Sequence, residues 1–184
     1  GAGIRSQKYC TDFSINNLVY GASIDAESHN RGELWCATLW DMTWNIINQV
    51  GTINANLYNL AGGGGNNIAL KLVTEGMRLQ QCSPGFISGR NAILQADLVA
   101  NAGANRNELW AAFAKRGMGA TATAPGSSTT VGLVENFDIP DNLGVNPNAP
   151  LNAWVALDAS AKQYSYSAGM DLQTAVPLDA QALL

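Results

Sequence analysis

The chain has 184 residues, of which 47% are hydrophobic, 8% aromatic and only 13% charged. A chain of this length and apolar content can bury one sizeable core, which excludes disorder throughout. The formal net charge is -4, and the charges are scattered singly, without the basic stripe of a nucleic-acid or polybasic membrane partner. The longest apolar stretches fall far short of the roughly 20 residues that cross a bilayer. We therefore expect no nucleic acid and no membrane among its partners.

The first 28 residues show no sustained hydrophobic period, and we expect an irregular entry segment there. A helix is predicted over residues 33–50, because apolar residues recur at helical spacing on two stripes. These stripes are Trp35, Leu39, Met42 and Ile46, and Trp40, Trp44 and Ile47. Because both are apolar, we expect this helix to be the most buried element and Trp40 to lie in the core.

Three further helices are predicted. The glycine-rich stretch 61–67 reads as a loop before a helix over residues 68–77, and Ser83-Pro84-Gly85 separates it from a helix over 87–98. A short helix follows over 108–115. The positive charges of Lys115 and Arg116 interact favourably with the negative, C-terminal end of its dipole. Arg90 falls among apolar residues of the third helix, so we expect it to be buried and paired with a carboxylate or a carbonyl.

The composition changes after residue 119. Residues 120–130 are rich in Thr, Ala, Ser and Gly, which is typical of a linker or an exposed loop. Four of the six prolines lie beyond residue 130, and short strands are predicted at 154–157 and 164–166. The predicted architecture is mainly α: a small helical bundle over residues 1–119 and a loop-rich tail over 120–184.

The candidate chemistry centres on His29, the only histidine, which lies just before the long helix between Asp25, Glu27 and Glu33. Flanking carboxylates can orient an imidazole as an acid or as a hydrogen-bond donor. The alternative is an ordinary surface histidine near a helix terminus. His29 and Glu33 have the spacing of two metal ligands, but two ligands do not make a site. Glu33 can instead stabilise the first turn of the helix by its interaction with the helix dipole.

The cysteines do not supply the missing metal ligands. Cys10, Cys36 and Cys82 include no Cys-x-x-Cys pair and can form at most one disulfide. We therefore expect no metal site within this chain. Arg5, a lone charge in the irregular segment, reads on composition alone as a solvated side chain.

Three segments taken together resemble the C-terminal half of the fungalysin metallopeptidases, which are secreted zinc endopeptidases related in architecture to thermolysin. The first is Gly3-Ile4-Arg5 with Tyr9-Cys10-Thr11-Asp12, and the second is His29-x-x-Gly32-Glu33-Leu34-Trp35. The third runs from Cys82-Ser83-Pro84-Gly85-Phe86 through Gly89-Arg90-Asn91-Ala92 to Gly117-Met118-Gly119. The similarity extends over about residues 3–138, and Asn91 departs from it, standing where many relatives have Asp.

The resemblance implies the C-terminal portion of an enzyme that hydrolyses peptide bonds with zinc. In that family a His-Glu-x-x-His helix supplies two zinc ligands and a Glu on a following helix supplies the third. This chain contains neither the His-Glu-x-x-His helix nor the Gly-Glu-Gly-Trp-like segment that carries the third ligand. The chain alone should then be inactive, and its partners would be a peptide or protein substrate and the missing zinc-binding lobe or another chain.

The resemblance also assigns roles to three residues. His29 looks like the histidine that donates a hydrogen bond to the developing oxyanion, with Asp25 or Glu27 orienting it. Arg5 looks like the arginine that binds a substrate carbonyl. An alternative reading is a catalytically inactive helical module retained for interaction with, or folding of, a partner chain.

Overall fold

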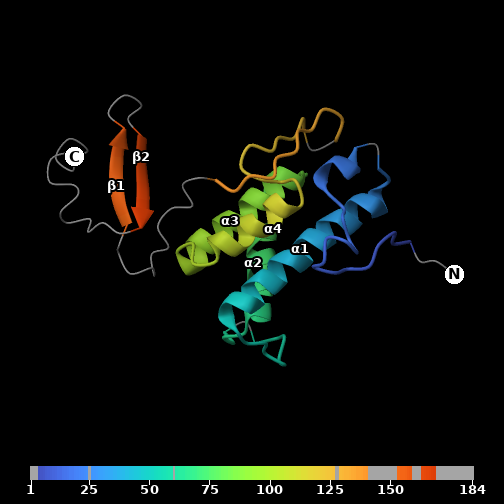
Figure 1. Cartoon of the computed structure of the whole chain (residues 1–184). Helices are drawn as coiled ribbons and strands as arrows, with labels where there is room; N and C mark the ends of the chain where they lie inside the picture. Colours follow the sequence, from blue (N-terminus) through green and yellow to red (C-terminus); the bar gives the residue numbers. More distant parts are fainter. Residues whose placement is uncertain are drawn as a thin grey trace.

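The computed structural model describes residues 4–24, 26–59, 61–126 and 129–140, together with the backbone of two strands, 153–158 and 163–168. The described elements are helical up to residue 115 (Figure 1). In chain order they are η1 (Tyr20–Ser23), α1 (Ser28–Val50), α2 (Gly65–Leu79), α3 (Phe86–Asn101), α4 (Arg106–Lys115), β1 (Ala153–Asp158) and β2 (Gln163–Ala168). The mainly α class predicted from the sequence is confirmed.

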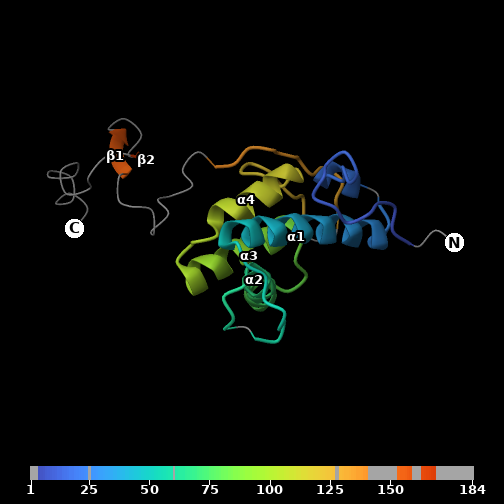
Figure 2. The same ribbon diagram turned by 60° about the horizontal axis from the view of Figure 1, so that its bottom comes forward.

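Helix α1 is the central element and packs against η1, α2 and α4 (Figure 2). It begins five residues earlier than predicted, because the Glu27 side chain caps it by accepting a hydrogen bond from the His29 backbone N–H. It ends at Gly51, whose φ of 76° lies in the left-handed region that favours glycine. None of the described helices is both long and apolar enough to cross a membrane.

The core forms where the four long helices meet η1 and the chain that follows α4. Its largest apolar members are Tyr20, Met42, Ile46, Leu72, Ile93, Leu109, Phe113 and Met118. Helix α2 approaches α1 closely, because a Cβ at Gly65 would lie 2.5 Å from the Cα of Ile47. The N-terminus of α2 therefore covers the C-terminal end of α1.

The expectation that Trp40 lies in the core is wrong. Trp40 is 40% exposed, and its ring meets Trp44 edge to face with centroids 6.2 Å apart. Of the stripe Trp40, Trp44 and Ile47, only Ile47 is buried. The reason is geometric: α2 meets α1 at Ile46 and Ile47, and the described part of the chain leaves the flank at Trp40 open.

The expectation for Arg90 is confirmed. Its Nη1 donates to the backbone carbonyls of Met118 and Gly119, and its guanidinium lies 4.8 Å from the centroid of the Trp110 ring. Burial lowers the pKa of Arg90 to about 10. Asn91 Oδ1 accepts a hydrogen bond from Arg90 Nε within α3. The two carbonyl contacts of Nη1 join α3 to the chain beyond α4.

Residues 117–123 pair with residues 134–138, and Glu135 contacts the entry segment. Gly119 N donates to Asn136 O at 2.6 Å, and Thr123 and Val134 exchange two backbone hydrogen bonds. Glu135 accepts a hydrogen bond from the backbone of Gly21. The predicted division at residue 119 stays a prediction.

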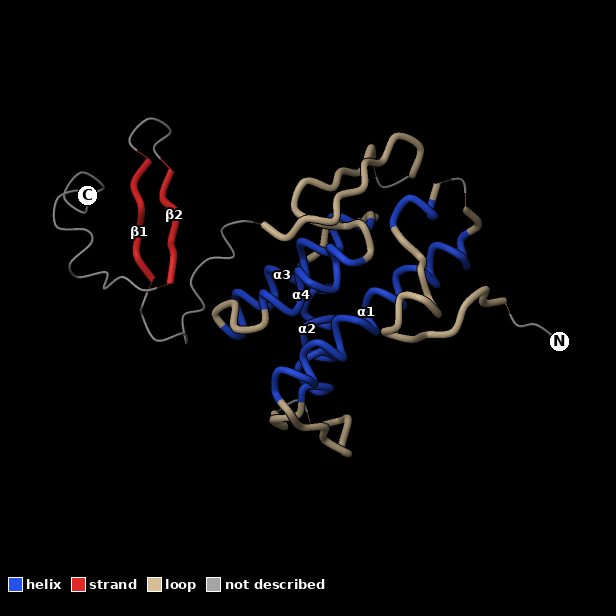
Figure 3. Tube along the Cα trace, viewed as in Figure 1, coloured by secondary structure: helices blue, strands red, loops and turns tan. Residues whose placement is uncertain are grey.

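The two strands predicted in the tail are confirmed at the level of the backbone (Figure 3). Strands β1 and β2 pair antiparallel, with Ala153 opposite Ala168 and Asp158 opposite Gln163. Each extends one or two residues beyond the predicted ends, because sequence patterns predict a strand better than they predict its ends.

Candidate functional site

The entry segment is held on α1 by Glu33, a carboxylate without solvent exposure. Its Oε2 accepts from the backbone N–H of Ser6 at 2.9 Å and from the Ser6 hydroxyl at 3.0 Å, and its Oε1 accepts from Gln7 N at 2.7 Å. Burial raises the pKa of Glu33, but the hydrogen bonds from Ser6 and Gln7 outweigh it, so the pKa lies below its ordinary value. Glu33 therefore joins two segments that are far apart in sequence.

His29 lies on the first turn of α1, with its side chain 58% exposed. Its Nδ1 is 2.7 Å from Glu27 Oε1, and its backbone N–H donates to Glu27 Oε2 at 2.9 Å. Among the described residues, Nε2 has no hydrogen-bond partner. One ring nitrogen is thus fixed by the protein and the other is open to a ligand.

Glu27 is an ionised anchor for this histidine. Hydrogen bonds from the Ser28 hydroxyl, the His29 ring and the His29 backbone lower the pKa of Glu27 to about 2. Of the two carboxylates predicted to orient His29, Glu27 contacts its ring. The other, Asp25, lies outside the described residues.

Arg5 lies beside His29, although 24 positions separate them in the sequence. Arg5 Nη1 donates to the backbone carbonyl of His29 at 2.8 Å, and the side chain is exposed to solvent. A guanidinium carries five N–H donors, so this contact leaves most of them for another acceptor. The interpretation of Arg5 as an isolated solvated charge misses this contact. Glu33 brings the two segments together, and the composition of residues 3–6 does not indicate that they meet.

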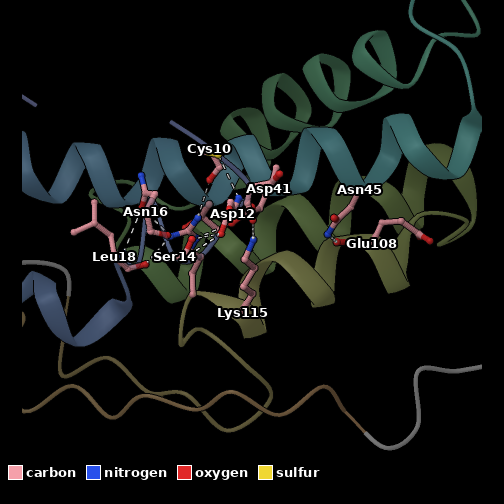
Figure 4. Close-up of polar contacts among 12 residues, drawn as sticks. Cys10, Asp12, Ser14, Asn16, Leu18, Asp41, Asn45, Glu108 and Lys115 are labelled. Carbon is pink, nitrogen blue, oxygen red and sulfur yellow. Dashed lines mark hydrogen bonds and ion pairs between the residues drawn. The ribbon is translucent and has the colours of Figure 1, made fainter. Parts of the chain in front are cut away.

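A second, buried cluster fixes the other end of the entry segment. Asp41 Oδ2 accepts from Arg116 Nε at 2.6 Å, and Asp41 Oδ1 accepts from Lys115 Nζ at 2.7 Å (Figure 4). Arg116 also donates to the backbone carbonyls of Asn16 and Leu18, at 2.8 and 3.0 Å. The sequence assigned Lys115 and Arg116 only to the helix dipole. The missed signal was Asp41, a carboxylate between the apolar residues Trp40 and Met42 of α1, which needs a partner when it is buried.

The metal-ligand spacing of His29 and Glu33 does not develop into a metal centre. Both Glu33 oxygens already accept hydrogen bonds from the entry segment. The described residues hold no group of three or more His, Cys, Asp and Glu side chains that could bind a metal ion. The donor set found here therefore does not fit a metal site on its own.

The geometry therefore gives His29 two contacts: its ring is oriented by Glu27, and its backbone carbonyl holds the Arg5 guanidinium. The sequence profile of the fungalysin metallopeptidases (M36) matches residues 1–122, about two thirds of the chain. The chain therefore belongs to the fungalysin metallopeptidase family.

Individual relatives agree with this assignment. The chain is 44% identical over 123 residues to extracellular metalloproteinase 4 of Arthroderma otae, covering 64% of this chain and 19% of the relative. It is 38% identical over 146 residues to an extracellular metalloproteinase of Pyrenophora tritici-repentis, covering 75% of this chain and 21% of the relative. The chain thus spans about a fifth of the length of these relatives.

Proposed function

We propose that this chain is the C-terminal part of a secreted, fungalysin-type zinc endopeptidase, and that it supplies contacts to the substrate and the transition state. The observation that carries the proposal is the arrangement of Glu27, His29 and Arg5: a fixed imidazole with an open Nε2 next to a partly engaged guanidinium. The relatives named extracellular metalloproteinases support the secreted location and a peptide or protein substrate.

His29 is proposed to stabilise the negative charge that develops on the carbonyl oxygen of the scissile peptide bond. With Nδ1–H directed to the Glu27 carboxylate, Nε2 carries a hydrogen only when the ring is an imidazolium. The ionised Glu27 stabilises that charge and holds the ring in place. A preorganised donor of this kind contributes about 3 kcal/mol to transition-state stabilisation.

Arg5 is proposed to bind a carbonyl of the substrate. Its contact with the His29 carbonyl holds the guanidinium on the first turn of α1, and the unused N–H groups suit a planar acceptor. Because such a contact exists in the bound substrate as well as in the transition state, it contributes to binding in both.

Zinc is proposed as the metal of the complete enzyme, where it would activate the attacking water and polarise the carbonyl. Its ligands would lie outside these 184 residues, because the sequence contains no His-Glu-x-x-His motif. We also propose that the helical part and the tail beyond it are separate units of the peptidase.

The test compares two variants of the complete peptidase in steady-state kinetics. His29→Ala is expected to lower kcat by about 10²–10³ with a much smaller change in KM, because the oxyanion contact forms chiefly in the transition state. Arg5→Ala is expected to raise KM as well. Asn30→Ala, an exposed neighbour on α1, serves as the matched control with unchanged constants.

A wild-type kcat in a folded His29→Ala enzyme would remove the oxyanion role. Unchanged constants in both variants would instead identify His29 and Arg5 as ordinary surface residues.

A further inference from the structure

The loop between α1 and α2 projects from the helices and exposes three large apolar side chains (Figure 3). Ile53 is 60% exposed, Leu57 is 52% exposed and Tyr58 is 96% exposed, so both faces of the tyrosine ring are open to a ligand. Single exposed apolar residues are ordinary on a protein surface, whereas several in one short loop indicate a binding surface. We call residues 52–59 the apolar loop.

Buried asparagines hold the backbone of the apolar loop in place. Asn66 Oδ1 accepts from Asn54 N at 2.9 Å, and Asn66 Nδ2 donates to Asn54 O at 2.8 Å. Asn67, which has no solvent exposure, donates from Nδ2 to the backbone carbonyls of Asn56 and Asn59, both at 3.0 Å. Because the first turn of α2 fixes the loop backbone, the exposure of its apolar side chains is built into the fold.

The glycine-rich stretch 61–67 closes the apolar loop on α2. A Cβ at Gly64 would lie 2.5 Å from Asn54 N and 2.6 Å from Asn66 Oδ1, so only glycine fits there. Gly65 N also donates to Thr52 O at 2.9 Å. A loop that is ordered before it meets a ligand loses little conformational entropy on binding.

The segments around the apolar loop bring no charge to this surface. No charged residue occurs between Asp41 and Lys71, a range that includes the end of α1, the loop and the start of α2. The exposed polar side chains there include the amides of Asn48, Asn56 and Asn59. A charged partner therefore gains no ion pair from these segments, and a neutral one finds hydrogen-bonding groups.

The partner must present an apolar face to Tyr58 and hydrogen-bonding groups to the amides, without charge. A neutral polysaccharide does both, because the C–H groups of each sugar ring form an apolar face and its hydroxyls donate and accept. Such a face packs on an aromatic ring, and an asparagine amide offers two donors and an acceptor. A lipid bilayer fits less well, because asparagines alternate with apolar residues in the loop and would lose water without gaining partners.

We propose that the apolar loop is a binding site for a neutral polysaccharide, with Tyr58 stacked on a sugar ring and the amides of Asn56 and Asn59 bonded to hydroxyls. The site lies about 30 Å along the α1 axis from His29. It is therefore separate from the residues proposed to contact the peptide substrate, and it does not depend on that function.

The first experiment measures retention of the 184-residue chain by insoluble neutral polysaccharides. The purified chain is mixed with microcrystalline cellulose or with chitin particles, and the free protein is measured after sedimentation. These two probes separate a polymer with hydroxyls alone from one that also carries acetamido groups. We expect retention by at least one of them, with an affinity that is unchanged between about 0.05 and 0.5 M NaCl, because no charge takes part.

Three variants test the stacking contact. Tyr58→Ala is expected to weaken retention about tenfold, because it removes the stacked ring. Its Tm should equal that of the wild type, because the side chain is 96% exposed. Tyr58→Phe keeps the ring and should bind as the wild type does. The matched control is Val99→Ala, at an apolar residue of α3 that is 71% exposed, and it should leave retention unchanged.

Absence of retention on both polymers would overturn the proposal, and so would equal retention of the wild type and Tyr58→Ala. An affinity that falls with added salt would also overturn it, because the adsorption would then be electrostatic. Cosedimentation with phosphatidylcholine vesicles that depends on Tyr58 would overturn it in favour of a lipid surface. A dimer in sedimentation velocity that Tyr58→Ala abolishes would overturn it in favour of a second copy.

Hydrolysis of a short soluble peptide by the complete peptidase separates this site from the proposed function. Tyr58→Ala should leave kcat and KM for that peptide unchanged, whereas His29→Ala should lower kcat and leave retention on the polysaccharide unchanged. A peptidase that is active but not retained overturns only the polysaccharide site. One that is retained but inactive overturns only the proposed function.

Discussion

Two polar clusters hold the entry segment on the helices, and they differ in how completely their donors are used. In the buried cluster, Asp41 receives Lys115 and Arg116, and Arg116 has no solvent exposure. In the exposed cluster, Glu27 fixes His29, and Arg5 reaches only the His29 backbone carbonyl. Both join α1 to a segment distant in sequence, and the second presents most of its donors to solvent.

The difference separates stability from chemistry. A buried guanidinium must have every donor paired, which leaves Arg116 nothing to offer a substrate. An exposed guanidinium or imidazole with one contact is positioned but still able to bind. The buried cluster therefore holds the lobe together, and the exposed cluster uses that rigid base to present His29 and Arg5.

The largest expected effect comes from breaking the buried cluster. Arg116→Leu leaves the carboxylate of Asp41, which is 1% exposed, with Lys115 as its charged partner. Removing one member of a buried ion pair destabilises a protein by about 3–5 kcal/mol. Urea unfolding of the 184-residue chain measures this loss. The matched control is Arg78→Leu, at a side chain 73% exposed, with an expected change within about 0.5 kcal/mol. Similar losses in the two variants would contradict the distinction.

The second prediction concerns Glu33, which holds Ser6 and Gln7 of the entry segment on α1. Glu33→Gln removes one acceptor oxygen and leaves a backbone N–H of Ser6 or Gln7 unpaired, which costs about 1–3 kcal/mol. In the complete peptidase the same change should raise KM, because Arg5 is held beside His29 by the segment that Glu33 anchors. Urea unfolding and steady-state kinetics check the two parts. An unchanged KM with lowered stability would restrict Glu33 to a structural role.

A smaller effect is expected at Trp40, on the open flank of α1. Because this residue is 40% exposed, Trp40→Ala should destabilise the chain by less than about 1 kcal/mol. Phe113→Ala, at a fully buried core position, should cost about 3–5 kcal/mol. Urea unfolding of the two variants compares them. A loss above about 2 kcal/mol at Trp40 would show that the flank is covered in solution.

The sequence predicted the helices better than it predicted which of their faces are covered by neighbouring segments. Helical periodicity found all four long helices, and the need of a buried guanidinium for carbonyl partners found the role of Arg90. Periodicity failed at Trp40, because it shows which residues share a face and not which face a neighbour covers. The contact of Arg5 with His29 also lay beyond reach, since it depends on the tertiary anchor at Glu33. The resemblance to the family indicated both His29 and Arg5 as candidate site residues, which the local sequence pattern could not do.

The smallest expected effect is the pH dependence that Glu27 confers on the exposed cluster. The pKa of Glu27 in the folded chain is about 2, against an ordinary value of 4.5, so the folded state binds this proton less readily than the unfolded state. By linkage, the stabilisation is fully present above pH 4.5 and is lost as the pH falls toward 2. Glu27→Gln should therefore be less stable than the wild type at pH 6, and the difference should vanish near pH 2.

Urea unfolding of both proteins between pH 6 and pH 2 measures this difference. Ser28→Ala keeps the carboxylate but removes the hydroxyl that contributes most to the lowered pKa, so it should show a smaller loss over the same window. A difference between wild type and Glu27→Gln that stays constant with pH would mean that Glu27 does not hold His29 through its charge. The orienting role would then pass to Asp25, and the Asp25→Asn variant should show the pH-dependent loss instead.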